Sequence, residues 1–214
     1  TGQLIRSGAP TTASLKFEYD PVGNRIAQVK NGARTDYQTN ALNQYESAGT
    51  AVFTHDADGN LETRMENGNT IRYEYDPMNR LVRILENDVP VWSCAYDALG
   101  NRRSVTTGGV TTSYIVDPAG LGDVVAEYDG AALQRRYIHG RNLVADQTAA
   151  GATRYYSLDA LTSTLALTSE GGAVIGRFTY APFGNVVSSS GETTPFQFVG
   201  GLGVMNDEIG RAHV

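Results

Sequence analysis

The sequence predicts an all-β protein: a repeat array of antiparallel β-hairpins that form one continuous, curled sheet. Three observations support this fold class. Two turn signals recur along the chain at a nearly constant spacing, the segments between them have strand length, and some of these segments alternate apolar and polar residues. The composition agrees, because 24 Gly and many Thr and Val residues in 214 are typical of strands and turns, not of helices.

The first turn signal is an aromatic residue followed by Asp and, three residues later, by Gly or Asn. Copies begin at Tyr19, His55, Tyr75 and Tyr96, weaker ones at Val116, Leu158 and Tyr180, and degenerate ones at Thr39 and His139. Consecutive copies start 16 to 23 residues apart. Pro, where present, fixes φ, Asp hydrogen-bonds its own backbone, and Gly or Asn accepts positive φ, so each copy predicts a tight turn.

The second turn signal follows the first after 12 or 13 residues. It is Asn31-Gly32, Asn67-Gly68, Asn87-Asp88, Gly108-Gly109, Asp129-Gly130, Gly151 and Gly171-Gly172. Asn-Gly pairs favour the turns whose twist matches that of a β-hairpin. The segments between turns are five to seven residues long, which suits strands and is too short for a stable helix. Each unit therefore reads as turn, strand, turn, strand.

Side-chain alternation assigns faces to these strands. From Thr70 to Tyr75, the residues Ile71, Tyr73 and Tyr75 share one face. A lone hairpin of this size is marginal in water, so successive hairpins should join side by side, and strand twist should curl the sheet. One alternative is a helix over 152–170, where Leu158, Leu161 and Leu165 have helical spacing. The alternation of Leu165 with Leu167 favours another hairpin.

The repeat divides the chain into three parts. Residues 1–13 are a lead-in, residues 14–191 form about nine units of about 20 residues, and residues 192–214 depart from the repeat. An open sheet has two raw edges that invite pairing with other strands. We expect the sheet to curl enough to protect these edges, a terminal segment to cross one of them, or the chain to self-associate. The segments 1–13 and 192–214 are the candidates for edge covers.

Charge and composition exclude several classes of function. The net charge of −6 argues against a nucleic-acid partner. The longest apolar runs are far too short to span a membrane. A single cysteine, Cys94, excludes an internal disulfide framework and a zinc site of several thiolates. The chain begins at Thr1 without a signal peptide, so we expect a piece of a longer protein.

Two aspartate clusters are better explained as turns than as sites. Asp117 to Leu121 has the order Asp-Pro-x-Gly and lies on the repeat register, which explains it as a turn. Asp56 to Asn60 begins like a calcium loop, but position twelve, where such a loop needs Glu, is Asn67.

The other candidates for chemistry are few. His55 and His139 occupy the anchor slot of the repeat, which favours packing, and His213 is the third histidine. Cys94 shares a strand face with Trp92 and Tyr96, so a buried structural thiol is favoured over a Cys–His nucleophile pair. No phosphate loop or nucleophile elbow is present. The sequence therefore predicts no catalytic, cofactor-binding or metal-binding residue and no cofactor.

The aromatic residues of the repeat have two interpretations. They are Phe17, Tyr19, Tyr73, Tyr75 and Tyr96. Cross-strand aromatic pairs stabilise a sheet by roughly 0.2–1 kcal/mol each, which favours a packing ladder between hairpins. Exposed Tyr and Arg side chains would instead contact sugars or a partner surface.

The copies at Tyr19, Tyr75 and Tyr96 resemble the YD repeats of the Rhs family. This family includes bacterial polymorphic toxins, the C components of Tc toxins, wall-associated bacterial proteins and teneurins. A second match, to the Rhs-associated core, covers Arg154 to Thr164, Tyr180 to Asn185 and Pro195 to Gly201. Thr162 stands where the family usually has Gly, and Ala181 stands in the Asp slot, so these two turns should be weaker.

The resemblance implies a function as well as a fold. It implies a strip of sheet that spirals into a hollow shell, and in toxin members the shell encloses a C-terminal toxin segment. The chain stops before the stretch in which the self-cleavage motif of the family is expected. We therefore expect a non-enzymatic structural shell segment, secreted or at a cell surface, whose partner is the C-terminal toxin or effector of the same parent protein. A cell-surface adhesive or carbohydrate-binding module is the alternative.

Overall fold

The computed structural model describes residues 14–119 and 123–207. Within these ranges the chain forms 18 β-strands and one short 3-10 helix, η1 (Gly200–Leu202), which confirms the all-β fold. No helix among these residues is long and apolar enough to cross a membrane. The strands are β1 (Leu15–Tyr19), β2 (Arg25–Lys30), β3 (Ala33–Thr39), β4 (Tyr45–Ala48), β5 (Ala51–His55), β6 (Leu61–Glu66), β7 (Asn69–Tyr75), β8 (Leu81–Glu86), β9 (Val89–Tyr96), β10 (Arg102–Thr107), β11 (Val110–Val116), β12 (Val124–Asp129), β13 (Ala132–His139), β14 (Leu143–Thr148), β15 (Thr153–Leu158), β16 (Thr164–Ser169), β17 (Val174–Tyr180) and β18 (Val186–Gly191).

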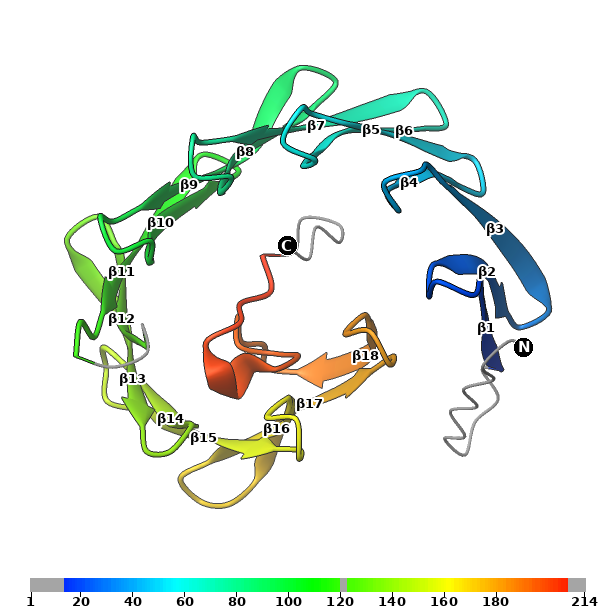
Figure 1. The fold of residues 1–214 in the computed structure, drawn as a ribbon. Helices are drawn as coiled ribbons and strands as arrows, with labels where there is room; N and C mark the ends of the chain where they lie inside the picture. Colours follow the sequence, from blue (N-terminus) through cyan, green and yellow to red (C-terminus); the bar gives the residue numbers. More distant parts are fainter. Residues whose placement is uncertain (1–13, 120–122, 208–214) are drawn as a thin grey trace. The chain divides into compact units, whose positions relative to one another are not determined.

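The chain folds as two compact units, divided within β9 between Ser93 and Cys94. The first unit contains β1 to β8 and the start of β9, and the second contains the end of β9 and the strands up to β18 (Figure 1). Within each unit, successive strands along the chain pair in antiparallel orientation. The array of antiparallel hairpins is therefore confirmed.

The first turn signal forms a five-residue turn that is held by its own side chains. Asp20 Oδ1 accepts the backbone N–H groups of Val22 and Asn24, at 3.0 and 2.7 Å. The Asn24 amide donates to Asp20 Oδ2 at 3.0 Å, and Gly23 takes a positive φ of 95°. In this motif Asp thus accepts backbone N–H groups, Gly takes the positive φ that the turn requires, and Asn holds the Asp carboxylate in place.

Turns of the same kind recur along one edge of each unit. The acceptors of the equivalent backbone N–H groups are Asn40, Asp56, Asp76, Asp97 and Asp159. The residue before each turn pairs with the residue six positions later, next to a β-bulge: Tyr19 with Arg25, Thr39 with Tyr45, His55 with Leu61, Tyr75 with Leu81, Leu158 with Thr164, and Tyr180 with Val186. The repeated copies in the sequence therefore occupy equivalent bends.

The second turn signal connects the hairpins at the opposite edge. Asn31 and Gly32 have φ values of 53° and 83°, and Asn67 and Gly68 have 50° and 82°. Two successive positive φ values define the turn that suits the twist of a two-residue hairpin. The Asn-Gly pairs in the sequence therefore have the turn geometry that their composition predicts.

The aromatic slot before each turn links one unit of the repeat to the preceding one. The Tyr75 hydroxyl donates to the Leu61 carbonyl at 3.1 Å, and the Tyr180 hydroxyl donates to the Thr164 carbonyl at 2.7 Å. Both acceptors are the first residue after the preceding turn. Tyr therefore has two functions in this slot: its ring packs on the sheet, and its hydroxyl donates a hydrogen bond to this backbone carbonyl.

The inner face of the sheet is an apolar ladder, as the aromatic pattern predicts. Phe17 and Tyr73 are buried. Ile84 pairs with Tyr73 on β7 and with Trp92 on β9, and both Ile84 and Trp92 are buried. The helical alternative for 152–170 is wrong, because this stretch forms the hairpin of β15 and β16. The five-residue turn at 159–163 divides the stretch into two segments that are too short for a stable helix.

The Asp side chains that cap the turns should make the free energy of unfolding depend on pH. The Asn60 amide lowers the pKa of Asp56, the Arg80 side chain lowers that of Asp76, and the Asn101 backbone N–H lowers that of Asp97. A carboxyl whose folded pKa is depressed stabilises the fold above its unfolded pKa of about 3.9 and loses this effect as the pH falls through the folded pKa. We expect the urea midpoint to stay level from about pH 7 to 5 and to fall below about pH 4. Replacing all three carboxylates with Asn should make the fall shallower, and an unchanged profile would contradict this origin.

Thr162 is strained, as its departure from the family pattern predicts. Its φ is 65°, a left-handed value that is unfavourable for a β-branched residue, and its buried hydroxyl has no hydrogen-bond partner. Thr162→Gly should raise the free energy of unfolding by about 1 kcal/mol, since relief of strain exceeds the added chain entropy. The reciprocal change Gly23→Thr, at a position with open space around it, should lower the free energy by about 1–2 kcal/mol. Urea denaturation measures both, and a destabilised Thr162→Gly variant would refute the assignment of strain.

Candidate functional site

Residues 192–207, here called the strap, leave β18 and lie over one face of the second unit (Figure 1). We expected the segment 192–214 to cover a sheet edge, and for its described part this expectation is wrong. The side chains of the strap pack on the sheet face, and their partners come from β10 and from β12 to β17. The reason is that Phe196 and Phe198 gain more burial on the apolar face than at an edge. Residues 1–13 and 208–214 lie outside the described residues.

Phe196 is the apolar anchor of the strap. It is 1% exposed and packs in a cluster with Val124, Tyr137 and Leu143. The rings of Tyr137 and Phe196 meet edge to face, with centroids 4.9 Å apart. Full burial of a Phe side chain contributes about 1.5–3 kcal/mol, so Phe196 alone makes a large contribution to the free energy that keeps the strap on the sheet.

A buried charge network lies beside the apolar cluster. Asp146 of β14 is 0% exposed and accepts two hydrogen bonds from Arg154, from Nε at 3.0 Å and from Nη2 at 2.8 Å. The Tyr156 hydroxyl donates to Asp146 Oδ2 at 2.5 Å, and Arg135 Nη1 donates to Oδ1. Both carboxylate oxygens are thus satisfied, which a buried charge requires.

The same network reaches the strap. Arg154 Nη1 donates to the Thr193 carbonyl at 2.9 Å and to Glu192 Oε2 at 2.9 Å. The Tyr156 hydroxyl lies 2.8 Å from Thr194 Oγ1. Burial and the adjacent Asp146 raise the pKa of Tyr156, so this phenol stays protonated and keeps donating. Arg154 and Tyr156 therefore connect the sheet to the strap.

The second half of the strap docks on the turn at residues 159–163 and on the strand that follows it. Thr164 Oγ1 donates to the Phe196 carbonyl at 2.7 Å, and the Val199 N–H donates to Ser163 Oγ at 3.1 Å. A side chain at Gly184, whose φ is 83°, would meet the Phe198 ring at 2.5 Å. Gly184 thus serves both its own turn and the close approach of the strap.

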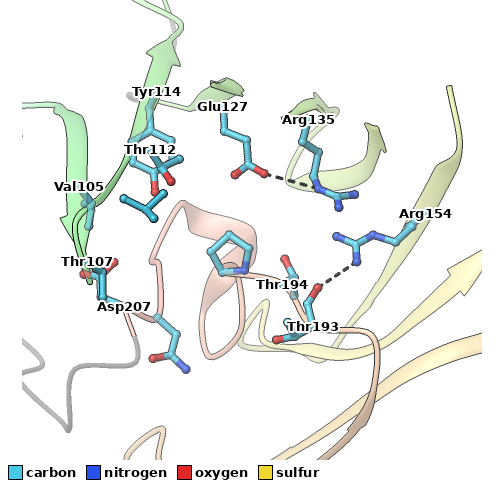
Figure 2. Close-up of a pocket in the computed structure, with 13 residues that line it drawn as sticks. Val105, Thr107, Thr112, Tyr114, Glu127, Arg135, Arg154, Thr193, Thr194 and Asp207 are labelled. Atoms are coloured by element: carbon cyan, nitrogen blue, oxygen red, sulfur yellow. Dashed lines mark hydrogen bonds and ion pairs between the residues drawn. The ribbon is translucent and has the colours of Figure 1, made fainter. Parts of the chain in front are cut away.

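Between the strap and strands β10 to β13 and β15 lies a cavity of about 430 Å³ that is open to solvent and lined by both polar and apolar side chains. Its lining includes Tyr114, Glu127, Arg135, Arg154, Thr193 and Asp207 (Figure 2). The lining carries two acidic and two basic side chains and several hydroxyls. It therefore fits a neutral ligand with hydrogen-bonding groups better than an ion.

Two acidic groups of this cavity, Asp207 and Tyr114, have raised pKa values. Burial raises the pKa of Asp207, although Arg102, whose Nη1 is 2.7 Å from Asp207 Oδ1, opposes the shift. Burial and then Glu127 raise the pKa of Tyr114 to about 12. Both shifts come chiefly from burial, and a structural ion pair of this kind perturbs a pKa without catalysis.

None of the described histidines, nor Cys94, is among the residues that line the cavity. Cys94 is buried and its pKa is raised by burial, which suppresses thiolate formation. His139 Nε2 lies 2.9 Å from the Val124 carbonyl, in the same relation to the preceding turn as the Tyr hydroxyls. Among the described residues, no group of three or more His, Cys, Asp or Glu side chains is placed to hold a metal ion. His55 is half-buried at the end of β5, and His213 is outside the described residues.

The aspartate clusters serve as turns. Asp56 accepts the N–H groups of Asp58 and Asn60, and Asp117 accepts that of Ala119 at 2.9 Å. Gly120 and Leu121 of the second cluster fall outside the described residues. In the described part, both clusters use the carboxylate to cap the backbone.

Sequence reasoning missed Asp146 as a buried charge. The strand Leu143-Val144-Ala145-Asp146 gives one signal, since Leu143 and Ala145 are buried and a carboxylate beside them needs a partner. That partner, Arg154, lies on the next strand and pairs directly with Asp146. The partners of Arg154 on the strap, Glu192 and Thr193, lie 38 and 39 positions further along the chain and have no sequence signal.

The family model of the teneurin YD-shell matches residues 1–211. The chain therefore belongs to this family, which confirms the resemblance to YD repeats. None of the curated proteins compared with the chain matches it.

Similar solved structures include Tc toxin complexes. The chain is 14% identical to a crystal structure of TcdB2-TccC3, with 88% of this chain and 15% of that chain covered and a TM-score of 0.39. The form of this complex without its hypervariable C-terminal region is 13% identical, with 91% of this chain and 15% of that chain covered and a TM-score of 0.38. A Tc holotoxin pore from Photorhabdus luminescens with a TccC3 mutation is 14% identical, with 88% of this chain and 14% of that chain covered and a TM-score of 0.33. The chain thus spans about one seventh of these chains.

Removal of the buried carboxylate should destabilise the second unit. Asp146→Asn removes the buried counter-ion of Arg154 and leaves it only the exposed Glu192, and breaking a buried pair in this way costs about 3–5 kcal/mol. Glu192→Gln is the matched control, because this side chain is 53% exposed and should cost under about 1 kcal/mol. Urea denaturation followed by tyrosine fluorescence measures both, and equal effects would contradict the role of Asp146.

Phe196→Ala should release the strap more than it disturbs the strands. Truncation of a buried Phe costs about 3–5 kcal/mol, and the loss falls on the contact between strap and sheet. Hydrogen exchange should therefore rise about 100-fold or more at Gln197 and Gly200, while amides of β7 and β8 in the other unit stay unchanged. Equal acceleration in both units would show that Phe196 does not act through the strap.

Proposed function

We propose that the chain is a non-enzymatic structural segment of a YD-shell wall that encloses or presents a C-terminal polypeptide of the same parent protein. Membership of the YD-shell family supports the wall function. The observation that carries the proposal is the strap, which places the chain after β18 on a sheet face and holds it there through Phe196 and Arg154. A wall that receives its own C-terminal segment on one face is suited to hold the polypeptide that continues from that segment.

The work of such a wall is steric. In this proposal residues 14–191 form the repeat array and 192–214 begin the next segment, of which the described part, 192–207, lies against the sheet. The wall needs no reacting group, and the buried Cys94 and the turn-bound Asp56 and Asp117 each have a structural use. We propose a secreted or cell-surface location, in line with the toxin members of the Rhs family, and a toxin or effector as the enclosed polypeptide.

Limited proteolysis of the protein expressed from its whole gene tests this function. The polypeptide beyond Val214 should resist protease in the native protein and be cleaved rapidly in urea. The Asp146→Asn variant should expose it, and the Glu192→Gln variant should not. Cleavage at equal rates in the native and unfolded protein would refute enclosure, and a new N-terminus that appears with time without protease would refute a non-enzymatic role.

A carbohydrate-binding module is the second candidate, and the polar cavity beside the strap favours it. Tyr114 offers a ring face, and Glu127 and Thr193 offer hydrogen-bonding groups of the kind that sugar hydroxyls pair with. A glycan array with the wild-type chain should then show hits that Tyr114→Ala removes. An array without hits would leave the shell wall as the single function.

A further inference from the structure

The cavity beside the strap has one wall from the sheet and one wall from the strap. Of its 13 lining residues, eight lie on strands β10 to β13 and β15, and five lie on the strap. The strap residues are Thr193, Thr194, Pro195, Asn206 and Asp207, so they come from both ends of the strap. Figure 2 shows side chains of both walls around a common space. The cavity therefore exists only while the strap is docked on the sheet.

Several hydroxyl groups of the lining are available to a ligand. Four lining side chains make no hydrogen bond to another described residue: Thr107, Thr112, Tyr114 and Thr193. Thr193 binds Arg154 through its backbone carbonyl, which leaves its hydroxyl available. Each hydroxyl can donate one hydrogen bond and accept others. The lining therefore suits a ligand that carries several hydroxyl groups of its own.

The charges and the apolar residues of the lining favour a neutral ligand. Glu127 Oε1 lies 3.6 Å from Arg135 Nε, and Asp207 is paired with Arg102, so each carboxylate has a cationic partner within the chain. The apolar lining residues are Val105, Val110 and Pro195. A saccharide offers hydroxyls at the edges of its ring and C–H groups on its faces, which matches this lining. The volume also lies in the range of small-molecule sites, about 300–1,000 Å³.

We propose that a neutral saccharide binds in this cavity and holds the strap on the sheet. The inference rests on the proposed shell function, because the strap leads to the polypeptide that the wall would enclose. A ligand that contacts both walls binds the docked strap and not the released strap, so its binding free energy adds to docking. By linkage, a strap that docks more weakly also lowers the affinity for the sugar. Occupancy of the cavity thus controls how readily the strap leaves the wall.

Two backbone amides report directly on strap docking. The Thr164 N–H donates to the Gln197 carbonyl at 2.9 Å, and the Gly201 N–H donates to the Thr162 carbonyl at 2.9 Å. Each bond joins the strap to the rest of the second unit, and neither amide belongs to a residue that lines the cavity. Their hydrogen exchange therefore measures release of the strap without direct contact with the sugar.

Native-state hydrogen exchange of the whole chain, with and without sugar, tests the proposal. The probes are glucose, galactose, N-acetylglucosamine and maltose, each up to about 0.1 M. For a sugar with a Kd of about 10 mM, exchange at Thr164 and Gly201 should slow about tenfold at about 0.1 M, because the released population falls by the factor 1 + [L]/Kd.

Two Tyr variants show whether the sugar acts through the cavity. Tyr114→Phe removes one hydroxyl from the lining and should raise the Kd about fivefold, so the slowing falls to about threefold. Tyr155→Phe is the matched control, because Tyr155 is 44% exposed and does not line the cavity, and it should keep the full effect.

The remaining outcomes overturn the proposal. Sugars also stabilise proteins by exclusion from their surface, and this effect would slow the amides of β7 and β8 in the first unit as well. Equal slowing in both units, or slowing that Tyr114→Phe leaves unchanged, would therefore exclude binding in the cavity. No slowing by any of the four sugars would exclude the coupling. Protease protection of the C-terminal polypeptide in sugar-free buffer should not depend on Tyr114→Phe, so a failure here is distinct from a failure of the proposed shell function.

Discussion

The aspartate-capped turn is the interaction on which the rest of the structure depends. Asp20 and its equivalents bind two backbone N–H groups and an amide of the same turn, which fixes the turn at five residues. A fixed turn sets the register of the two strands that leave it, and register decides which side chains face the core. The Tyr hydroxyl before a turn then donates to the carbonyl of the first residue after the preceding turn of the same kind, as at Tyr75 and Tyr180. In this way each turn is joined to the previous one along the array.

The strap makes use of this regularity at the end of the array. Its sheet-side partner Arg154 lies opposite Asp146 on the neighbouring strand, so strand register alone brings these two side chains together. The strap adds Phe196 to an apolar cluster and two acceptors to Arg154. Buried ion pairs contribute little net stability but are costly to break. The network thus specifies where the strap lies more than it strengthens the sheet.

Much of the fold could be predicted from the sequence, because the information is local. Turn residues such as Asp76 and Asn67-Gly68 determine the bends through their own backbone, and alternation from Ile71 to Tyr75 assigns the faces. The position of the strap could not be predicted, since it depends on contacts between residues far apart in the chain, such as Phe196 with Val124. The strain at Thr162 could be predicted from the sequence, because its position in the turn requires a positive φ and Thr adopts positive φ poorly.

Native-state hydrogen exchange at the capped turns tests the central claim most directly. The backbone N–H groups of Asn24, Asn60 and Asn101 are bound by the Asp of their own turn, at 2.7, 2.8 and 2.9 Å. If these caps organise the array, the three amides should exchange as slowly as the amides of the adjoining strands. Exchange at the rate of an unstructured loop, with the strands still protected, would show that the sheet holds the turns and not the reverse.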